Sequence, residues 1–153
     1  MSGRVVGIYT AAVGGKPMDA RDAVRAIVGV GLEGDRYATK TGEFSEREGG
    51  GREVTLIARE AIATANAKVA IAEHETRRNL VTEGVDLDAL IGQTFAVGEV
   101  LMVGVRDCPP CAYLEELTRP GVRGALKGGG GLRADIVRDG VIRIGDQISV
   151  STV

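Results

Sequence analysis

Apolar and β-branched residues recur along this chain in short runs that are separated by glycine-rich turns. Runs of this length and composition are typical of β-strands. The pattern predicts seven to nine strands, with candidates at residues 4–10, 23–28, 53–57, 77–81, 94–97, 100–105, 135–138, 141–144 and 147–150. The Asp139-Gly140 pair between two of these runs predicts a two-residue hairpin.

Helical patterns are fewer. Residues 58–69 are rich in alanine and predict one clear helix. Shorter helical segments are expected at residues 112–117 and after Asp86, which can cap a turn through Leu90. Residues 38–52 are polar, glycine-rich and aperiodic, which predicts a long surface loop. Because strands and helices do not alternate as βαβ units, the expected fold is mostly β: a barrel with a few short peripheral helices.

Length, composition and charge narrow the class of protein. The chain has 153 residues, the size of one domain, and 44% of them are apolar, which is enough to build a core. The net charge of −2 supplies no overall field that would attract nucleic acid or an anionic membrane. No apolar run approaches the ~20 residues of a membrane span, and the N-terminus lacks a signal-peptide pattern. With two cysteines close together, a reducing, cytoplasmic setting is expected.

Both cysteines lie in one motif, Cys108-Pro109-Pro110-Cys111, between a strand-like run and a helix-like run. The prolines cannot extend a strand ladder because they have no N–H group. Cys111 is therefore expected at the N-terminus of a short helix, where free backbone N–H groups favour a thiolate. A thiolate attacks electrophiles, carries sulfane sulfur or binds a soft metal.

The cysteine pair allows other interpretations. A thioredoxin-like redox pair would follow the first strand of a βαβ unit, which the pattern lacks. A zinc site needs four ligands, and His74 is the only histidine. Two small buried apolar side chains are the structural alternative. The Pro-Pro-Cys junction favours a reactive Cys111 with Cys108 as its neighbour or resolving thiol.

A second motif places four glycines, residues 128–131, between Lys127 and Arg133. The N–H groups of consecutive glycines can converge into a nest that binds an anion, and the flanking cations would add charge. Phosphate is the natural guest of such a nest. A flexible surface linker is the alternative, because no P-loop or dinucleotide-binding spacing is present.

Further charged residues allow either a functional or a structural interpretation. Arg77 and Arg78 are adjacent on an expected strand, so only one of them would face a given cavity, with Asn79 on the same face as Arg77. Solvated charges are the alternative. Asp35-Arg36 follows a glycine turn, where it either caps the turn or forms part of a site wall.

Taken in order, several motifs resemble the MOSC domain family, named for the C-terminal domain of molybdenum cofactor sulfurase. They are GLEGDR at residues 31–36, VTLI at 54–57, RRNLVT at 77–82, GVDL at 84–87 with LIG at 90–92, VGEV at 97–100, PCAYL at 110–114, GGLR at 130–133 and IGD at 144–146. The match runs from about residue 4 to residue 150, so residues 1–153 are expected to form a single stand-alone MOSC domain.

The resemblance implies a strongly twisted β-barrel, like the pyruvate-kinase barrel, with a cavity lined by the family's cysteine. Family members bind the molybdenum cofactor, a pterin dithiolene with a terminal phosphate, or handle sulfur destined for it. By its motif, Cys111 would be both the catalytic residue and the metal ligand. Tyr37 stands where many members have a histidine. The residues expected to hold the cofactor are Arg77, Arg78, Asn79, Lys127, Gly129, Gly130, Arg133, Asp35 and Arg36.

The resemblance further implies a reductase of N-oxygenated small molecules, or a sulfur carrier that holds a persulfide on Cys111. The alternative is a non-catalytic module that presents the cofactor and docks a cysteine desulfurase or a reductase. Larger proteins of the family join this domain to a pyridoxal-phosphate desulfurase. Pyridoxal phosphate would therefore enter this chemistry only through a partner protein.

Overall fold

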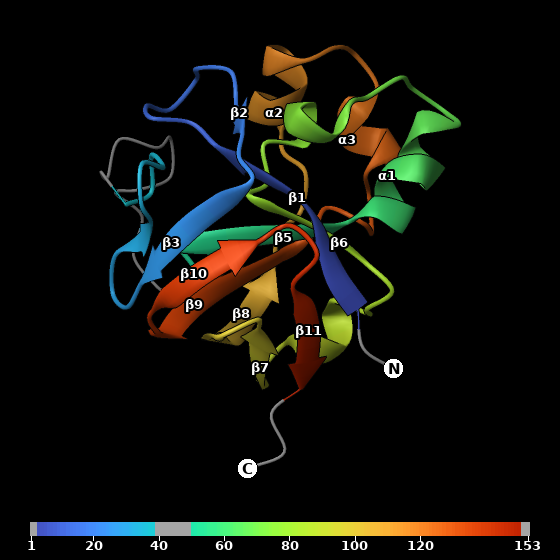
Figure 1. The fold of residues 1–153 in the computed structure, drawn as a ribbon. Coiled ribbons are helices and arrows are strands. Elements are labelled where there is room, and N and C mark those ends of the chain that lie inside the picture. The colour runs from blue at the N-terminus through green and yellow to red at the C-terminus, as the bar shows by residue number, and fades with distance from the viewer. Residues whose placement is uncertain (1–2, 39–49, 151–153) are drawn as a thin grey trace.

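The computed structural model describes residues 3–38 and 50–150, which form a β-barrel with helices gathered at one end (Figure 1). The strands are β1 (Gly3–Thr10), β2 (Asp19–Ala20), β3 (Ala23–Ile27), β4 (Gly31–Leu32), β5 (Val54–Ala58), β6 (Leu80–Glu83), β7 (Thr94–Val97), β8 (Val100–Asp107), β9 (Leu132–Arg138), β10 (Gly140–Arg143) and β11 (Gln147–Val150). The helices are α1 (Arg59–Asn66), α2 (Ala112–Leu117) and α3 (Val122–Ala125), with 3₁₀ turns η1 (Glu73–Thr76) and η2 (Asp88–Leu90). Among the described residues, none of the helices combines the length and apolarity that crossing a membrane would take.

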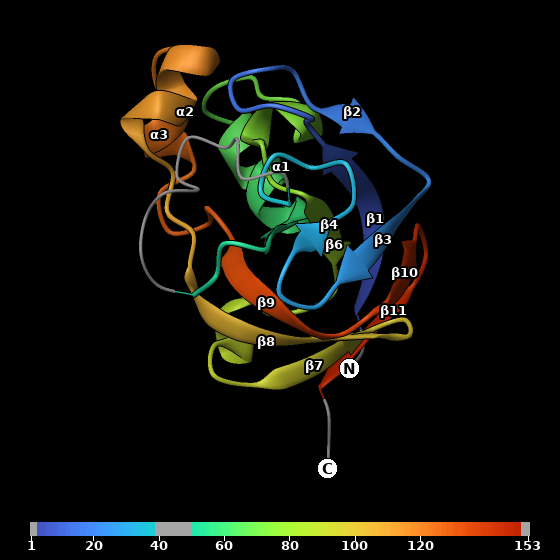
Figure 2. The same ribbon diagram turned by 90° about the vertical axis from the view of Figure 1, so that its left-hand side faces the viewer.

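Seven strands of the described part of the chain close the barrel, in the order β1-β11-β7-β8-β9-β5-β6 and back to β1. The pair β5–β6 is parallel and the other neighbours are antiparallel. Closure removes the free edges of the sheet. A small sheet of order β10-β3-β4 lies beside the barrel (Figure 2). The mostly-β barrel predicted from the hydrophobic pattern is confirmed.

The barrel encloses the main apolar core. Successive residues of a strand face opposite sides, and in β5 this turns Val54 and Leu56 into the interior and Ile57 outward. The outward residue belongs to a second buried cluster beneath the helices, formed by Ile57, Ile62, Ala65, Ile71, Val81, Leu114, Val122 and Leu126. The helices therefore cover one outer face of the barrel, and this layer includes α2, the helix that follows Cys111.

The strand expected at residues 77–81 begins only at Leu80. Arg77 directly follows the 3₁₀ turn η1 and has a left-handed backbone conformation, with φ of 60°. Strand alternation does not apply to residues that precede the strand. The prediction that Arg77 and Arg78 face opposite sides is therefore wrong, and both line the same cavity.

The hairpin predicted at Asp139-Gly140 is also wrong. Strand β9 pairs with β8 and β5, whereas β10 pairs with β3 in the small sheet, with Gly140 opposite Ala26. The Asp139 carboxylate accepts a hydrogen bond of 2.6 Å from the N–H of Val28. The Asp-Gly step thus carries the chain from one sheet to another instead of joining two paired strands.

Other predicted elements are confirmed with small changes at their ends. Helix α1 covers residues 59–66 of the predicted range 58–69 and ends at Asn66, whose side-chain oxygen accepts a hydrogen bond of 2.7 Å from the N–H of Ile71. Asp86 accepts a hydrogen bond of 3.1 Å from the N–H of Asp88 at the start of η2. The long loop predicted at 38–52 falls mostly outside the described residues.

Candidate functional site

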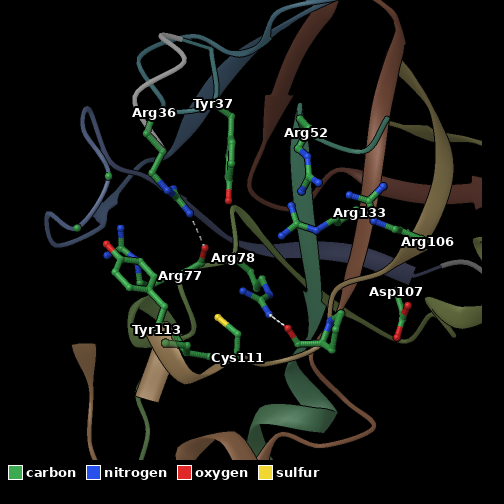
Figure 3. Close-up of a pocket in the computed structure, with 14 residues that line it drawn as sticks. Arg36, Tyr37, Arg52, Arg77, Arg78, Arg106, Asp107, Cys111, Tyr113 and Arg133 are labelled. Carbon is green, nitrogen blue, oxygen red and sulfur yellow. Dashed lines mark hydrogen bonds between the residues drawn. The ribbon is translucent and has the colours of Figure 1, made fainter. Parts of the chain in front are cut away.

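A cavity of about 390 Å³ lies at the helical end of the barrel and contains the side chain of Cys111 (Figure 3). Six arginines line it, together with one carboxylate among the described residues, that of Asp107. The cavity is therefore strongly positive in a protein whose net charge is −2. The lining residues are Gly14, Gly15, Arg36, Tyr37, Arg52, Arg77, Arg78, Arg106, Asp107, Pro109, Cys111, Tyr113, Leu114 and Arg133.

Cys111 is half-buried and is the residue that immediately precedes helix α2. Its carbonyl oxygen accepts a hydrogen bond of 3.3 Å from the N–H of Glu115, which confirms the helix predicted to begin after it. The cysteine packs against the apolar cluster beneath the helices and also lines the cavity. Cys108, by contrast, is only 1% exposed and does not line this cavity. The two sulfurs therefore have different environments.

Arg78 holds the segment that leads to Cys111. Its Nε donates a hydrogen bond of 2.7 Å to the carbonyl of Gly130, and its Nη2 donates one of 3.0 Å to the carbonyl of Cys108. The two prolines of this segment have no N–H group with which to join a strand. The guanidinium instead binds the segment through its carbonyl oxygens, so Arg78 positions Cys111 as well as lining the cavity.

Arg36 and Arg77, here called the loop group, lie on one side of the cavity (Figure 3). Arg36 donates hydrogen bonds of 3.1 Å to the Asp35 carboxylate and 3.0 Å to the Arg77 carbonyl, and it lies 4.6 Å from the centroid of the Tyr37 ring. Nη1 of Arg77 donates a hydrogen bond of 2.6 Å to the carbonyl of Lys16. Burial, together with the nearby charge of Arg36, lowers the pKa of Arg77 from its ordinary value.

Arg52, Arg106 and Arg133, here called the strand group, form the other side of the cavity (Figure 3). Arg106 of β8 is directly opposite Arg133 of β9 in the antiparallel pairing. Both side chains donate hydrogen bonds to the segment before Arg52, Arg106 to the carbonyl of Gly50 and Arg133 to that of Gly51. Like charges directly opposite each other on neighbouring strands repel. An anion bound between them would relieve this repulsion.

Asp35, a predicted site residue, is fully buried and does not line the cavity. Its Oδ1 accepts a hydrogen bond of 3.1 Å from the N–H of Ala11, and its Oδ2 accepts one of 3.3 Å from the N–H of Tyr37. It also pairs with Arg36 at 3.1 Å. Asp35 therefore joins the segment after β1 to the segment after β4, and so orients the arginine next to it.

Asn79 is likewise fully buried and lies outside the cavity lining. Its Oδ1 accepts a hydrogen bond of 3.0 Å from the N–H of Thr55, and its Nδ2 donates one of 3.1 Å to the carbonyl of Tyr9. The amide thus links the backbones of β5 and β1 near the start of β6. The structure accounts for this asparagine as a backbone link beside the arginines.

Replacing Asn79 by alanine is expected to lower the free energy of unfolding by about 3 kcal/mol, because the buried N–H of Thr55 and the part-buried carbonyl of Tyr9 lose their partner. Urea unfolding followed by circular dichroism measures this loss. Asn66→Ala is the matched control, since Asn66 makes one hydrogen bond near the surface, and about 1 kcal/mol is expected there. Equal losses in the two variants would contradict this role of Asn79.

The glycine run at 128–131, which includes the predicted residues Gly129 and Gly130, lines a neighbouring hollow of about 330 Å³. That hollow shares only Asp107 and Pro109 with the cavity of Cys111. Lys127 is exposed and lines neither space. The structure therefore brings Arg36, Arg77, Arg78 and Arg133 together with the cysteine, and it sets Lys127 and the glycines apart from them.

Close backbone packing accounts for the last two of these glycines. A Cβ atom on Gly131 would overlap the carbonyl oxygen of Leu56, and one on Gly130 would overlap the carbonyl oxygen of Cys108. Gly131 also has a φ of +117°, which side-chain-bearing residues rarely adopt. Glycine is therefore required here by space and backbone conformation.

Sequence reasoning did not find Arg52, Arg106 or Tyr113 as cavity residues. Arg106 stands at the end of a predicted strand, just before the cysteine motif, and this position is the one sequence signal that pointed toward it. Its neighbour in space, Arg133, is far away along the chain and is brought close by the β8–β9 register. The register of the two strands places Arg106 opposite Arg133, and motifs taken one at a time do not predict that register.

The fold and the cavity define a β-barrel protein with one half-buried thiol among arginines. The sequence model of the MOSC domain matches residues 44–149, which is more than half of the chain. The chain therefore belongs to the MOSC domain family.

Solved structures with a similar fold come from bacilli and from Escherichia coli. The YuaD protein from Bacillus subtilis has a TM-score of 0.80 at 19% identity, covering 98% of this chain and 96% of that chain. YiiM from Geobacillus stearothermophilus has a TM-score of 0.72 at 16% identity, covering 97% of this chain and 75% of that chain. YiiM from Escherichia coli has a TM-score of 0.70 at 17% identity, covering 100% and 71%. At these identities the likeness concerns the fold alone. No curated protein matches the sequence.

Proposed function

We propose that this protein binds the molybdenum cofactor in the arginine-lined cavity, with the Cys111 thiolate as the protein's ligand to molybdenum. The observation that carries the proposal is that Cys111 and six arginines line one cavity. Thiolates are soft ligands, and guanidinium groups bind phosphate through paired hydrogen bonds. The cavity thus combines a metal ligand with an anion site.

The size and chemistry of the cavity fit such a cofactor. Its volume of about 390 Å³ falls within the range of about 300–1,000 Å³ that is usual for small-molecule sites. In the described residues, no group of three or more His, Cys, Asp or Glu side chains could hold a bare metal ion. A metal held by the dithiolene of the cofactor would need few protein ligands, and the Cys111 thiolate would be one of them.

We assign different roles to different residues of the cavity. The strand group, Arg52, Arg106 and Arg133, would hold the phosphate end through charge-assisted hydrogen bonds. Arg78 positions the segment that carries Cys111, as its bonds to the carbonyls of residues 108 and 130 support. When bound, the cofactor would supply two-electron oxygen transfer for the reduction of an N-oxygenated small molecule. The electrons would come from a redox partner.

A related form of the proposal concerns sulfur. The Cys111 thiolate would attack the terminal sulfur of a persulfide on a cysteine desulfurase, whose pyridoxal phosphate stays with that partner. The partner's S–S bond breaks and the partner leaves as a thiolate, while Cys111 becomes a persulfide that keeps the terminal proton. An acceptor thiolate then attacks the terminal sulfur of the Cys111 persulfide. The S–S bond on Cys111 breaks, Cys111 leaves as a thiolate, and the acceptor becomes the persulfide. The half-buried position of Cys111 supports this form, because its sulfur is accessible from the cavity.

Protein purified from a host that makes the molybdenum cofactor is expected to contain about one molybdenum and one pterin per chain. Metal analysis by mass spectrometry and pterin analysis by fluorescence after oxidation measure the two contents. Protein from a host blocked in pterin synthesis is the control and should contain neither. If the first preparation lacks metal and pterin but releases thiocyanate with cyanide, the sulfur-carrier form stands alone. Absence of metal, pterin and cyanide-labile sulfur would contradict both forms.

A further inference from the structure

The loop group and the strand group lie on opposite sides of Cys111 in the view of the cavity (Figure 3). Within the strand group, the β8–β9 pairing joins Arg106 to Arg133, and both donate hydrogen bonds to the segment before Arg52. The loop group is joined by the contacts of Arg36 with the residues around it. The positive charge of the cavity is thus divided between two places. One phosphate at the strand group, as the proposed function has it, would leave the loop group facing the rest of the cavity.

Within the loop group, Arg77 has a buried donor that a ligand could satisfy. Its side chain is buried, with 9% of the residue exposed, and Nη1 is used by the carbonyl of Lys16 at 2.6 Å. Its Nη2 is buried and has no hydrogen-bond partner within residues 3–38 and 50–150. A buried donor without a partner is costly, more so when it carries charge. A neutral ligand without an acceptor at this point would leave that cost in place.

The surroundings of Arg77 favour an anion over a neutral acceptor. Burial, and to a smaller extent the charge of Arg36, lowers the pKa of Arg77 from its ordinary value, so the charged guanidinium lacks a full counter-charge within the described part of the chain. Arg36 is itself paired with Asp35 at 3.1 Å. Among the residues that the structure describes, the loop group therefore has one positive charge without a carboxylate paired to it, and that charge is on Arg77. Tyr113, whose hydroxyl lies close to Gly15, stands on the same side of the cavity (Figure 3). One bound oxyanion would therefore balance the charge of the loop group.

We infer that the small molecule processed at this site is an acid, whose carboxylate or phosphate group binds to Arg77 while its reacting end faces Cys111. The inference rests on the proposed function for the reacting end and on Arg77 for the anionic end. The six arginines of the cavity attract such a substrate at short range, whereas the net charge of −2 supplies no attraction at long range.

Binding of benzoate, a simple carboxylate, tests the anionic end without any turnover. Two of the three tyrosines, Tyr37 and Tyr113, line the cavity and the chain has no tryptophan, so tyrosine fluorescence reports on it. The titration is carried out at constant ionic strength on protein with and without the cofactor. Inorganic phosphate replaces benzoate in a parallel titration, which tells a carboxylate site from a phosphate site.

Arg77→Asn removes the guanidinium while keeping a residue type that tolerates the left-handed backbone of this position. It is expected to weaken benzoate or phosphate binding by about 10- to 100-fold. Arg77→Lys, which keeps the charge, should bind more tightly than Arg77→Asn. Arg123→Gln removes an exposed arginine of α3 outside the cavity and should bind like the wild type. Circular dichroism and thermal unfolding check that each variant is folded.

Turnover by the cofactor-loaded protein provides the second measurement. A neutral aryl amidoxime and the same amidoxime with a para-carboxylate are compared, with a chemical reductant as electron donor. The acid is expected to have the lower KM, and Arg77→Asn should raise that KM by about 10- to 100-fold with little effect on the neutral compound.

Three results would overturn the inference. They are equal anion binding by wild type and Arg77→Asn, equal KM values for the acid and the neutral amidoxime, or loss of pterin from Arg77→Asn, which would assign Arg77 to the cofactor. A wild type that lacks molybdenum and pterin, yet binds benzoate or phosphate through Arg77, would instead overturn the proposed function and support the anion site.

Discussion

Replacing Cys111 by serine is expected to abolish protein-bound molybdenum. Among the lining residues in the described part of the chain, Cys111 offers the only sulfur. A serine hydroxyl is a hard, protonated oxygen at neutral pH, and it replaces a soft thiolate poorly. We expect less than about a tenth of the wild-type metal content, since a loss of about 1.4 kcal/mol of ligation already corresponds to tenfold. Metal analysis of both proteins after gel filtration measures the difference.

Cys108→Ala is the matched control for this experiment. Cys108 lies three residues earlier, is buried, and does not line the cavity. Its replacement by alanine keeps a small apolar side chain at the site, so the metal content should stay at the wild-type level. Equal molybdenum in wild type and Cys111→Ser would argue against ligation by Cys111. Loss of metal from Cys108→Ala alone would move the ligand to the other sulfur.

Replacing Gly131 by alanine is expected to cost about 4 kcal/mol or more of unfolding free energy, an exceptional loss for one methyl group. The added Cβ would overlap the carbonyl oxygen of Leu56, a backbone atom of β5 that cannot move aside without distorting the barrel. The positive φ of +117° adds strain. Urea unfolding, or the yield of soluble protein where the variant does not fold, measures the effect.

Gly128→Ala separates the two causes. Gly128 belongs to the same run and also has a positive φ, +83°, but a Cβ there meets no atom within 4 Å. Backbone strain alone should cost about 1–2 kcal/mol. If the two variants lose the same stability, close packing is not what requires glycine at 131. An increase in cofactor loss with little change in stability would restore the anion-nest interpretation of the run.

The elements of the fold followed from local patterns, because alternation along a strand and alanine-rich helical sequence depend on nearby residues. Strands β1, β3, β5, β7, β8, β9 and β11 and helices α1 and α2 occur at the predicted places. Two predictions were wrong because contacts outside the local sequence pattern decided the conformation. At Asp139-Gly140, pairing of β10 with β3 prevailed over the hairpin signal. At Arg77, the 3₁₀ turn before it prevailed over the strand pattern.

For the candidate site too, local sequence predicted some features, and contacts between distant residues decided the others. The Pro-Pro-Cys junction was enough to place Cys111 just before a helix, because proline's missing N–H ends a strand wherever it occurs. The residue types of Asn79 and Asp35 did not reveal that both are buried backbone links, since a polar side chain can serve a ligand or the chain itself. Their hydrogen-bond partners, such as Thr55 and Ala11, became known only from the structure.

By itself, the sequence determined most of the strands, the two helices α1 and α2, the family resemblance and the position of one thiol, since each of these depends on residue types at short spacing. The tertiary structure alone decided that Arg52, Arg106 and Arg133 meet on one side of that thiol and that Arg36 and Arg77 meet on the other. The physical reason is that strand register and barrel closure bring together residues that are distant in the chain, and their charges act through space rather than along the backbone.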